Sequence, residues 1–347
     1  MNHRHVPSLS GRRSWYPFLV IFGILSAGAL GCAARGGVQA ATNAQPAVAA
    51  PDSAAPAMPM MRMPPPPPPV VVSDAAPGDG SYGVLIMAHG GGDAWNETVI
   101  EAAAEARHEG PVVVAFGMAH PVSMQQGVDT LDELGTERVS VVRLFVSGES
   151  FRVDTRFLLG LSDQEPELPW VKTPLDHDLT IATHEHGLMG SPEVSQILLT
   201  RALDLSEDPA GESVLLIAHG MGDDGENDRV LDNMRLAAGR IAEKGFAEVE
   251  VEALREDWEE ARVVAEAAIR SFVESRATAG RRVLVLPYRL SGFGPYAKVL
   301  DGLDYVAGDG LLPHDAISRW IERTAAGVAC ESGWQQRGCD RFTDGPQ

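Results

Sequence analysis

The sequence predicts an α/β fold of two duplicated domains, each a mostly parallel sheet of about four strands with helices on both faces. The first observation is a repeated phrase: Val84–Gly90 reads VLIMAHG and Val214–Gly220 reads VLLIAHG. Copies about 130 residues apart are too widely spaced for a solenoid and fit two duplicated domains. The second is the alternation of short strand and helix patterns in each half, which favours a parallel, helix-covered sheet.

The first half contains four apolar runs that predict strands and three amphipathic segments that predict helices. The expected strands cover residues 84–88, 112–116, 139–146 and, more weakly, 179–182. The expected helices cover residues 97–108, 123–134 and 192–203. The second half repeats the order with strands over 214–218, 249–254 and 283–287 and helices over 227–244, 258–275 and from His314 through Trp320. Each Ala-His-Gly histidine then follows the carboxyl end of a buried strand, where open α/β sheets place their ligands.

The first 31 residues have the features of a targeting signal. A basic start is followed by the uncharged apolar stretch 17–31, and Cys32 comes next after Gly31. This order resembles a bacterial lipoprotein signal with Cys32 as the lipidated residue, while Ala29 leaves open an uncleaved membrane anchor. In both cases we expect an exported protein that is anchored to the membrane on its outer side.

Composition gives the remaining boundaries. Residues 32–80 are rich in Ala, Pro, Met and Val and include six consecutive prolines, Pro64–Pro69, which predicts a polyproline spacer that forms no core. We expect two duplicated domains over 81–206 and 207–325 and a C-terminal tail over 326–347. In an oxidising compartment the tail cysteines, Cys330 and Cys339, are expected to form a disulfide rather than a metal site.

The charge of the chain excludes one class of partner. The formal net charge is −20 at pH 7. No basic stripe is available to neutralise phosphates, so nucleic acid is not expected as a partner. A small-molecule ligand is expected instead.

Several residues of the first half suggest a family. They are His89, Asn96, Ala119-His120-Pro121, and Leu144-Phe145 followed by Gly148. This arrangement resembles the sirohydrochlorin chelatases, the class II chelatases that insert cobalt, iron or nickel into a tetrapyrrole. The resemblance covers roughly residues 81 to 325 as two fused copies, so it implies that both expected domains, 81–206 and 207–325, are chelatase-like.

The resemblance implies a divalent metal held by two histidines across a cleft. The first is the Ala-His-Gly histidine, here His89 or His219, which would act as metal ligand and as acceptor of the pyrrole protons. The second lies in a Gly-x-His-x-x-x-Asp stretch, but Ser150 stands at that position in the first half and Gly294 in the second. Glu149 is the candidate that could replace the missing ligand, and a solvated loop residue is the alternative.

The same resemblance predicts which residues line a tetrapyrrole pocket. They are Gly90, Gly91, Asn96, His120, Ser150, Gly220, Asn227 and His314. For His314 a role at the start of the last helix is equally open. His184 and His186 could also share a metal from an extended segment, although a solvated loop is the favoured interpretation.

Three functions remain open from the sequence. The first is an exported chelatase that binds cobalt, nickel or iron at His89, with Glu149 as the candidate second ligand, and inserts it into a tetrapyrrole. The second is a non-catalytic, lipid-anchored carrier or sensor of a metal ion or tetrapyrrole that has lost the second histidine. The third is a binding module without metal, in which His89 and His219 are structural.

Overall fold

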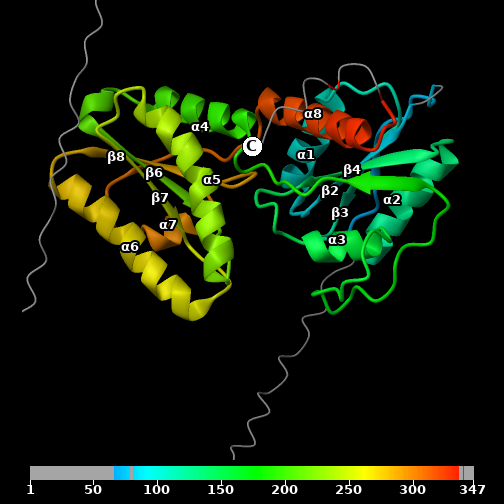
Figure 1. Cartoon of the computed structure of the whole chain (residues 1–347). Helices are drawn as coiled ribbons and strands as arrows, with labels where there is room; N and C mark the ends of the chain where they lie inside the picture. Colours follow the sequence, from blue (N-terminus) through cyan, green and yellow to red (C-terminus); the bar gives the residue numbers. More distant parts are fainter. Residues whose placement is uncertain (1–65, 79–80, 336–338, 340–347) are drawn as a thin grey trace, which may run out of the picture. The chain divides into compact units, whose positions relative to one another are not determined.

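The computed structural model describes residues 66–78, 81–335 and 339. The expected signal segment 1–31 and Cys32 lie outside the described residues, as does most of the predicted spacer. The described chain forms two sheets, one from each half (Figure 1). The predicted α/β class with two mostly parallel, helix-covered sheets is confirmed.

The first sheet has the strand order β1-β3-β2-β4-β5 and the second has the order β7-β6-β8-β9. In the first sheet the strands are β1 (Val70–Ser73), β2 (Gly83–Ala88), β3 (Val112–Phe116), β4 (Arg138–Leu144) and β5 (Thr180–Thr183). In the second they are β6 (Glu212–Ala218), β7 (Glu248–Ala253), β8 (Arg282–Tyr288) and β9 (Val306–Ala307). Neighbouring strands are parallel except for β1, which is antiparallel to β3.

The helices follow the same duplicated order. In the first half they are α1 (Asp93–Glu105), α2 (Pro121–Glu133), α3 (Arg152–Leu158) and α4 (Pro192–Leu205). In the second half they are α5 (Asp224–Ala242), α6 (Glu259–Thr278), α7 (Tyr296–Val299) and α8 (Asp315–Glu331), with a 3₁₀ turn at Pro209–Gly211 before β6. None of the helices in the described part of the chain combines the length and apolar content that a membrane crossing needs.

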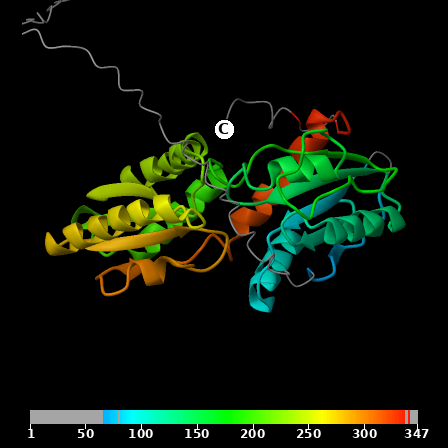
Figure 2. The same ribbon diagram turned by 90° about the horizontal axis from the view of Figure 1, so that it is seen from below.

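The two central strands, β2 and β6, are buried along their whole length. Helices cover both faces of each sheet, as Figures 1 and 2 show from two directions. In the second sheet, Leu216 packs into a core with α5 residues, while the adjacent Ile217 packs into a separate core with α6 residues. This burial on both faces explains why the strands are continuous apolar runs rather than alternating patterns.

The last helix of each half packs against the other half. α4 follows the first sheet but contacts α5 and β8, whereas α8 follows the second sheet but contacts α1 and β4 (Figure 1). One core cluster therefore runs through both halves and includes Ile86, Leu198, Leu286 and Ile317. The expected boundary between residues 206 and 207 divides the sequence repeat, but it does not divide the packing.

Several segments differ from the expected elements: α3, α7 and β9 were not expected, and three others differ in place or bounds. Val70–Ser73 pairs with β3 as an edge strand, so the end of the predicted spacer joins the first sheet, because three consecutive valines favour extended, half-buried backbone. α1 begins at Asp93, four residues earlier than expected. α8 continues beyond Trp320 to Glu331 and so occupies part of the predicted tail.

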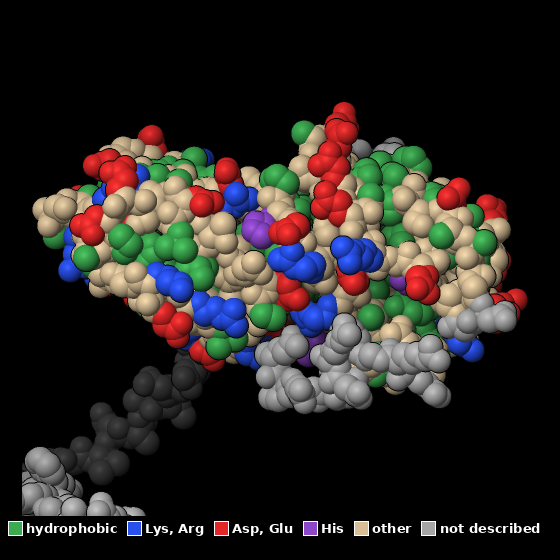
Figure 3. Space-filling view, turned by 90° about the horizontal axis from the view of Figure 1, so that it is seen from above, with side chains coloured by type: hydrophobic (Ala, Val, Ile, Leu, Met, Phe, Trp, Pro, Cys, Tyr) green, Lys and Arg blue, Asp and Glu red, His purple; other side chains and the backbone are tan. Residues whose placement is uncertain are grey.

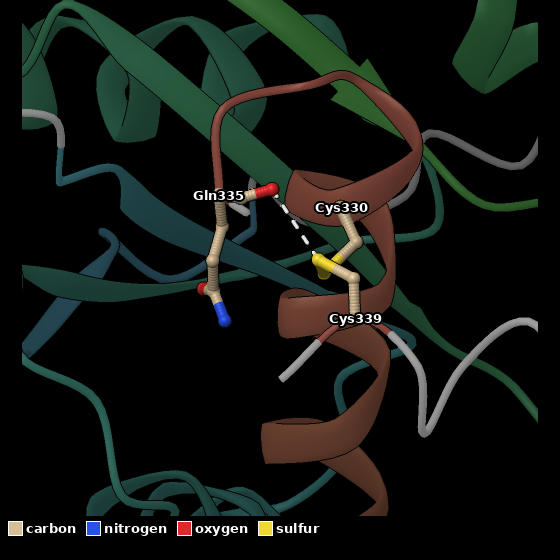
Figure 4. The surroundings of a disulfide bond; sticks show 3 residues. All are labelled: Cys330, Gln335 and Cys339. Carbon is tan, nitrogen blue, oxygen red and sulfur yellow. Dashed lines mark hydrogen bonds between the residues drawn. A yellow bond between two sulfur atoms is a disulfide. The ribbon is translucent and has the colours of Figure 1, made fainter. Parts of the chain in front are cut away.

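A disulfide joins Cys330, in the last turn of α8, to Cys339 (Figure 4). The Cα atoms are 5.6 Å apart, and Cys339 Sγ lies 3.3 Å from the carbonyl oxygen of Gln335. The pair therefore ties the segment that follows α8 back to the last turn of the helix.

His184 is buried in the core rather than solvated. Its Nε2 accepts a hydrogen bond from the backbone N–H of Arg143 at 2.9 Å, and its ring meets Trp320 of α8 edge-on at 5.6 Å. Burial, followed by the positive charge of Arg143, lowers the pKa of His184 to about 3. The favoured expectation of a solvated loop is wrong for His184, although His186 is exposed.

The contribution of α8 to stability is tested by Ile317→Ala. We call the packing of α4 and α8 against the opposite half the helix exchange, and α8 is one of the two exchanged helices. Ile317 lies on α8 and is fully buried in the shared core. Its truncation is expected to lower the free energy of unfolding by about 2–5 kcal/mol, because it leaves a cavity in that core. Equilibrium urea denaturation measures the change. Val264→Ala is the control, since Val264 of α6 is 70% exposed and its truncation should cost less than about 0.5 kcal/mol. Equal losses in the two variants would contradict the helix exchange.

The buried His184 predicts a specific pH dependence of stability. Its pKa is lowered in the folded state, so below about pH 6.5 the unfolded chain binds a proton that the folded chain does not. Stability should therefore fall by roughly 1.4 kcal/mol for each pH unit of acidification toward pH 3. His184→Gln should flatten the pH profile of the urea midpoint, while His186→Gln, the exposed neighbour, should leave it steep. If His184→Gln left the pH dependence of the urea midpoint unchanged, the claim that His184 is buried in its uncharged form would be wrong.

Candidate functional site

His89 and His219 occupy equivalent positions in the two sheets. Each follows the last residue of a central strand, Ala88 of β2 or Ala218 of β6. The next residue is a glycine in the left-handed region, with φ of 85° at Gly90 and 83° at Gly220. Glycine adopts this conformation without a steric penalty, so the chain turns sharply and leaves each imidazole at the end of its strand.

Both imidazoles are held in the same way. His89 Nδ1 lies 2.7 Å from the carbonyl oxygen of Gly90, and His219 Nδ1 lies 2.9 Å from that of Gly220. A carbonyl oxygen only accepts hydrogen bonds, so each Nδ1 must carry the proton. In the neutral ring the unshared electron pair is then on Nε2, the arrangement in which histidine binds metals or accepts a proton.

Both histidines line one cavity of about 630 Å³. A volume of this size is typical of sites for small molecules and cofactors. Residues from both halves contribute, including Ser147, Glu149, Ser150 and Phe151 after β4 and Arg289, Leu290, Ser291 and Gly294 after β8. The two copies of the repeat therefore share one site.

A tryptophan packs edge-on against each histidine. Trp95 lies 6.4 Å from His89 between ring centroids, and Trp258 lies 5.9 Å from His219. Both tryptophans line the cavity. Neither was among the residues predicted from the sequence, although both stand close to loops that follow central strands.

The two histidines differ in their acidic neighbours. Asp257 Oδ2 lies 3.2 Å from His219 Nε2. The fourth residue after β7 is Asp257, whereas the fourth residue after β3 is His120. His120 instead caps α2, where its Nδ1 accepts a hydrogen bond from Val122 N at 3.3 Å, and burial lowers its pKa. His120 is not among the residues that line the cavity.

Glu149 lines the cavity, but its carboxylate is already bound to arginine. Arg229 of α5 donates to Oε1 from Nε at 3.1 Å, and its terminal nitrogen lies 3.0 Å from the same oxygen. Arg152 Nε lies 3.5 Å from Oε2. A metal ion bound by Glu149 would have to compete with these two guanidinium groups.

A buried arginine, Arg143, binds the backbone of the loop that contains Glu149 and Ser150. The Arg143 side chain is 1% exposed and its guanidinium donates to the carbonyl oxygens of Gly148 and Ser150. Burial lowers the pKa of Arg143 to about 10. Arg143 could not be recognised from the sequence as part of the site, because an arginine inside a strand pattern carries no motif.

The remaining predicted pocket residues support the loops and helix ends around the site. Asn96 Oδ1 accepts from Gly91 N at 2.8 Å, and Asn227 Oδ1 accepts from Met221 N at 3.1 Å. His314 caps α8 by accepting from Ala316 N at 3.0 Å. Of the predicted pocket set, Gly90, Ser150 and Gly220 line the cavity, and Gly91, Asn96, His120, Asn227 and His314 do not.

The donors for a metal ion come from a small set. Within residues 66–78, 81–335 and 339, no three His, Cys, Asp or Glu side chains form a metal-binding group. In the cavity lining, His219 Nε2 and Asp257 Oδ2 lie 3.2 Å apart and form one pair of candidate donors. An imidazole and a carboxylate together suit first-row divalent ions, and water or a second ligand would complete their coordination.

Comparison with solved structures identifies the fold. SirB from Bacillus subtilis, solved with Fe3+, is similar with a TM-score of 0.54 at 14% sequence identity, over 74% of this chain and 98% of that one. DR2241 from Deinococcus radiodurans, described as a multi-domain protein with structural similarity to chelatases, matches with a TM-score of 0.46 at 18% identity, over 71% of this chain and 55% of that one. No family model and no curated protein matches the sequence. The chain thus has the fold of the class II chelatases, with its two Ala-His-Gly histidines on one cavity.

Proposed function

We propose that this protein binds a divalent metal ion of the cobalt, nickel or iron type, together with a tetrapyrrole, in the cavity that the two halves share. The observation that carries the proposal is the pair of equivalent imidazoles, His89 and His219, that line this cavity with Nδ1 bound to a backbone carbonyl. The similarity in fold to SirB supports the same ligand classes.

The donor set of the cavity fits such an ion. His89 and His219 would each supply Nε2, and Asp257 would add a carboxylate next to His219. Imidazole ligands favour first-row transition ions over magnesium and calcium, which prefer oxygen. The cavity is also lined by more acidic than basic side chains, and that charge attracts cations.

His89 is the residue we assign to proton transfer if the ion is inserted into a macrocycle. Insertion requires the pyrrole N–H protons to leave, and the imidazole of His89 could accept one of them at Nε2 once that nitrogen has released the metal ion to the macrocycle. The Gly90 carbonyl would continue to accept from Nδ1 and stabilise the imidazolium that forms. The apolar cavity walls would bind the ring and exclude water from the transfer.

A carrier or sensor of the same ligands is the second candidate. It is favoured by the state of the second catalytic position, where Ser150 replaces histidine and the adjacent Glu149 is paired with Arg229. Binding needs one competent face of the cavity, whereas insertion needs a ligand and a proton acceptor on opposite sides of the macrocycle.

Export with an anchor at Cys32 is part of this proposal. It rests on the basic and apolar order of residues 1–31. The disulfide between Cys330 and Cys339 supports it, since disulfides persist in oxidising compartments.

Metal binding is tested by titration of the protein with Co2+, followed by calorimetry and by the visible absorption of the bound ion. His89→Ala and His219→Ala are each expected to weaken binding at least about tenfold, which corresponds to about 1.4 kcal/mol. His186→Ala is the control, because His186 is exposed and does not line the cavity. An equal loss in the control, or no loss in either cavity variant, would reject the proposed site.

Absorbance of an added tetrapyrrole distinguishes the two candidate functions in the same samples. A spectrum that converts to that of the metal complex, and fails to convert in His89→Ala, indicates a chelatase. Binding of Co2+ without conversion indicates a carrier or sensor.

A further inference from the structure

The walls of the cavity are largely apolar and aromatic. Its lining includes Leu144, Phe145, Phe151, Trp95, Trp258, Met118, Met189, Met221 and Leu290. Phe145 and Phe151 pack together with ring centroids 5.1 Å apart. Aromatic faces and thioether groups favour contact with a flat, apolar ring.

The charged side chains that line the cavity are mostly acidic, whereas a site for a polyanion requires basic side chains. The acids in the lining are Glu149, Asp154, Glu167 and Asp257, and Arg289 is the one base among these described residues. A ligand that carries several carboxylates would meet this excess of negative charge at close range, in addition to the net charge of −20 of the whole chain.

Arg289 is already engaged within the protein. Its terminal nitrogen donates to Glu256 Oε1 at 2.5 Å, and its guanidinium lies 5.8 Å from the centre of the Tyr296 ring. Although burial opposes the charged form, Tyr296 and Glu256 together raise the pKa of Arg289. The one basic side chain of the lining is therefore neutralised by an internal carboxylate.

The arginines bound to cavity residues are engaged as well. Arg229 and Arg152 pair with Glu149. Arg255 donates to the carbonyl oxygens of Met221 and Gly222 and pairs with Asp224. On the face drawn in Figure 3, Lys and Arg side chains likewise lie beside Asp and Glu side chains. Each of these three guanidinium groups is therefore already paired with a carboxylate of the protein.

Two of the four acidic side chains in the lining are exposed to solvent, and the other two are buried or paired with arginine. Asp154 is buried and accepts a hydrogen bond from Leu168 N at 2.8 Å, and Glu149 is held by arginine. By contrast, the side chain of Asp257 is 73% exposed and Glu167 is exposed. These two carboxylates would repel an anionic ligand, whereas they attract a metal ion.

From this charge arrangement we infer that the organic ligand of the cavity is a flat, largely apolar macrocycle with few carboxylates, and not a polycarboxylate such as sirohydrochlorin. The inference rests on the proposed function, since it specifies the macrocycle that shares the cavity with the metal ion. The apolar walls of the cavity favour binding of the flat ring. Its acidic side chains disfavour carboxylates at the rim of that ring.

The test compares two metal-free probes by absorbance titration at low and high salt. Mesoporphyrin carries a pair of propionates, and sirohydrochlorin carries many carboxylates. Mesoporphyrin is expected to bind at least about tenfold more tightly, and added salt should strengthen the binding of sirohydrochlorin by screening the repulsion.

Glu167→Lys supplies the matched variant. It replaces an exposed acid of the cavity by a base and should tighten sirohydrochlorin binding about 3- to 10-fold, with a smaller effect on mesoporphyrin. Asp232→Lys is the control, because the side chain of Asp232 on α5 is 74% exposed, pairs with Arg235 and does not line the cavity.

Sirohydrochlorin binding as tight as that of mesoporphyrin, or weakened by salt, would overturn the inference. So would the failure of both macrocycles to bind. In that last case, binding of Co2+ that depends on His89 and His219 would leave the metal site standing, and the loss of Co2+ binding as well would remove both proposals.

Discussion

The exchange of the last helix between the two halves is the packing interaction on which the rest of the structure depends. α4 covers the second sheet and α8 covers the first, so apolar residues of both halves form one continuous core. Neither half can bury its sheet with its own helices alone. The burial of Ile317 and Trp320 against the first sheet connects the end of the chain to a domain that begins more than 200 residues earlier.

A shared core places the ends of the two central strands on a common cavity. Each end carries the same Ala-His-Gly turn, and each histidine is oriented by its own glycine carbonyl. The duplication therefore places two imidazoles, each with Nδ1 bound to its own glycine carbonyl, on opposite halves of one site. The surroundings of the two histidines differ. His219 has Asp257, the fourth residue after β7, beside Nε2, whereas the fourth residue after β3 is His120, which caps α2. The halves have kept the same framework and differ in the chemistry around it.

The elements that were predicted correctly are those determined by local sequence. The strands 112–116 and 214–218 agree closely with β3 and β6, because an uninterrupted apolar run that ends in a turn specifies a buried strand. The position of the two histidines at strand ends followed from the same pattern. The helix exchange was not predictable, since α4 and α8 present apolar faces that suit either sheet. The importance of Asp257 and Trp258 was also missed, as it depends on how the loop after β7 meets the loop of His219. His184 was assigned to solvent because a polar His-Glu-His segment resembles a loop, and only the contact with Trp320 of the exchanged helix reveals its burial.

The most direct test of the shared site is a crystal structure of the protein soaked with Co2+, with anomalous diffraction recorded at the cobalt absorption edge. The account predicts a peak inside the cavity, about 2.0–2.2 Å from Nε2 of His89 or His219. A peak on the protein surface away from both histidines, or a cavity without a peak at saturating Co2+, would contradict the claim that the two halves jointly form a metal site.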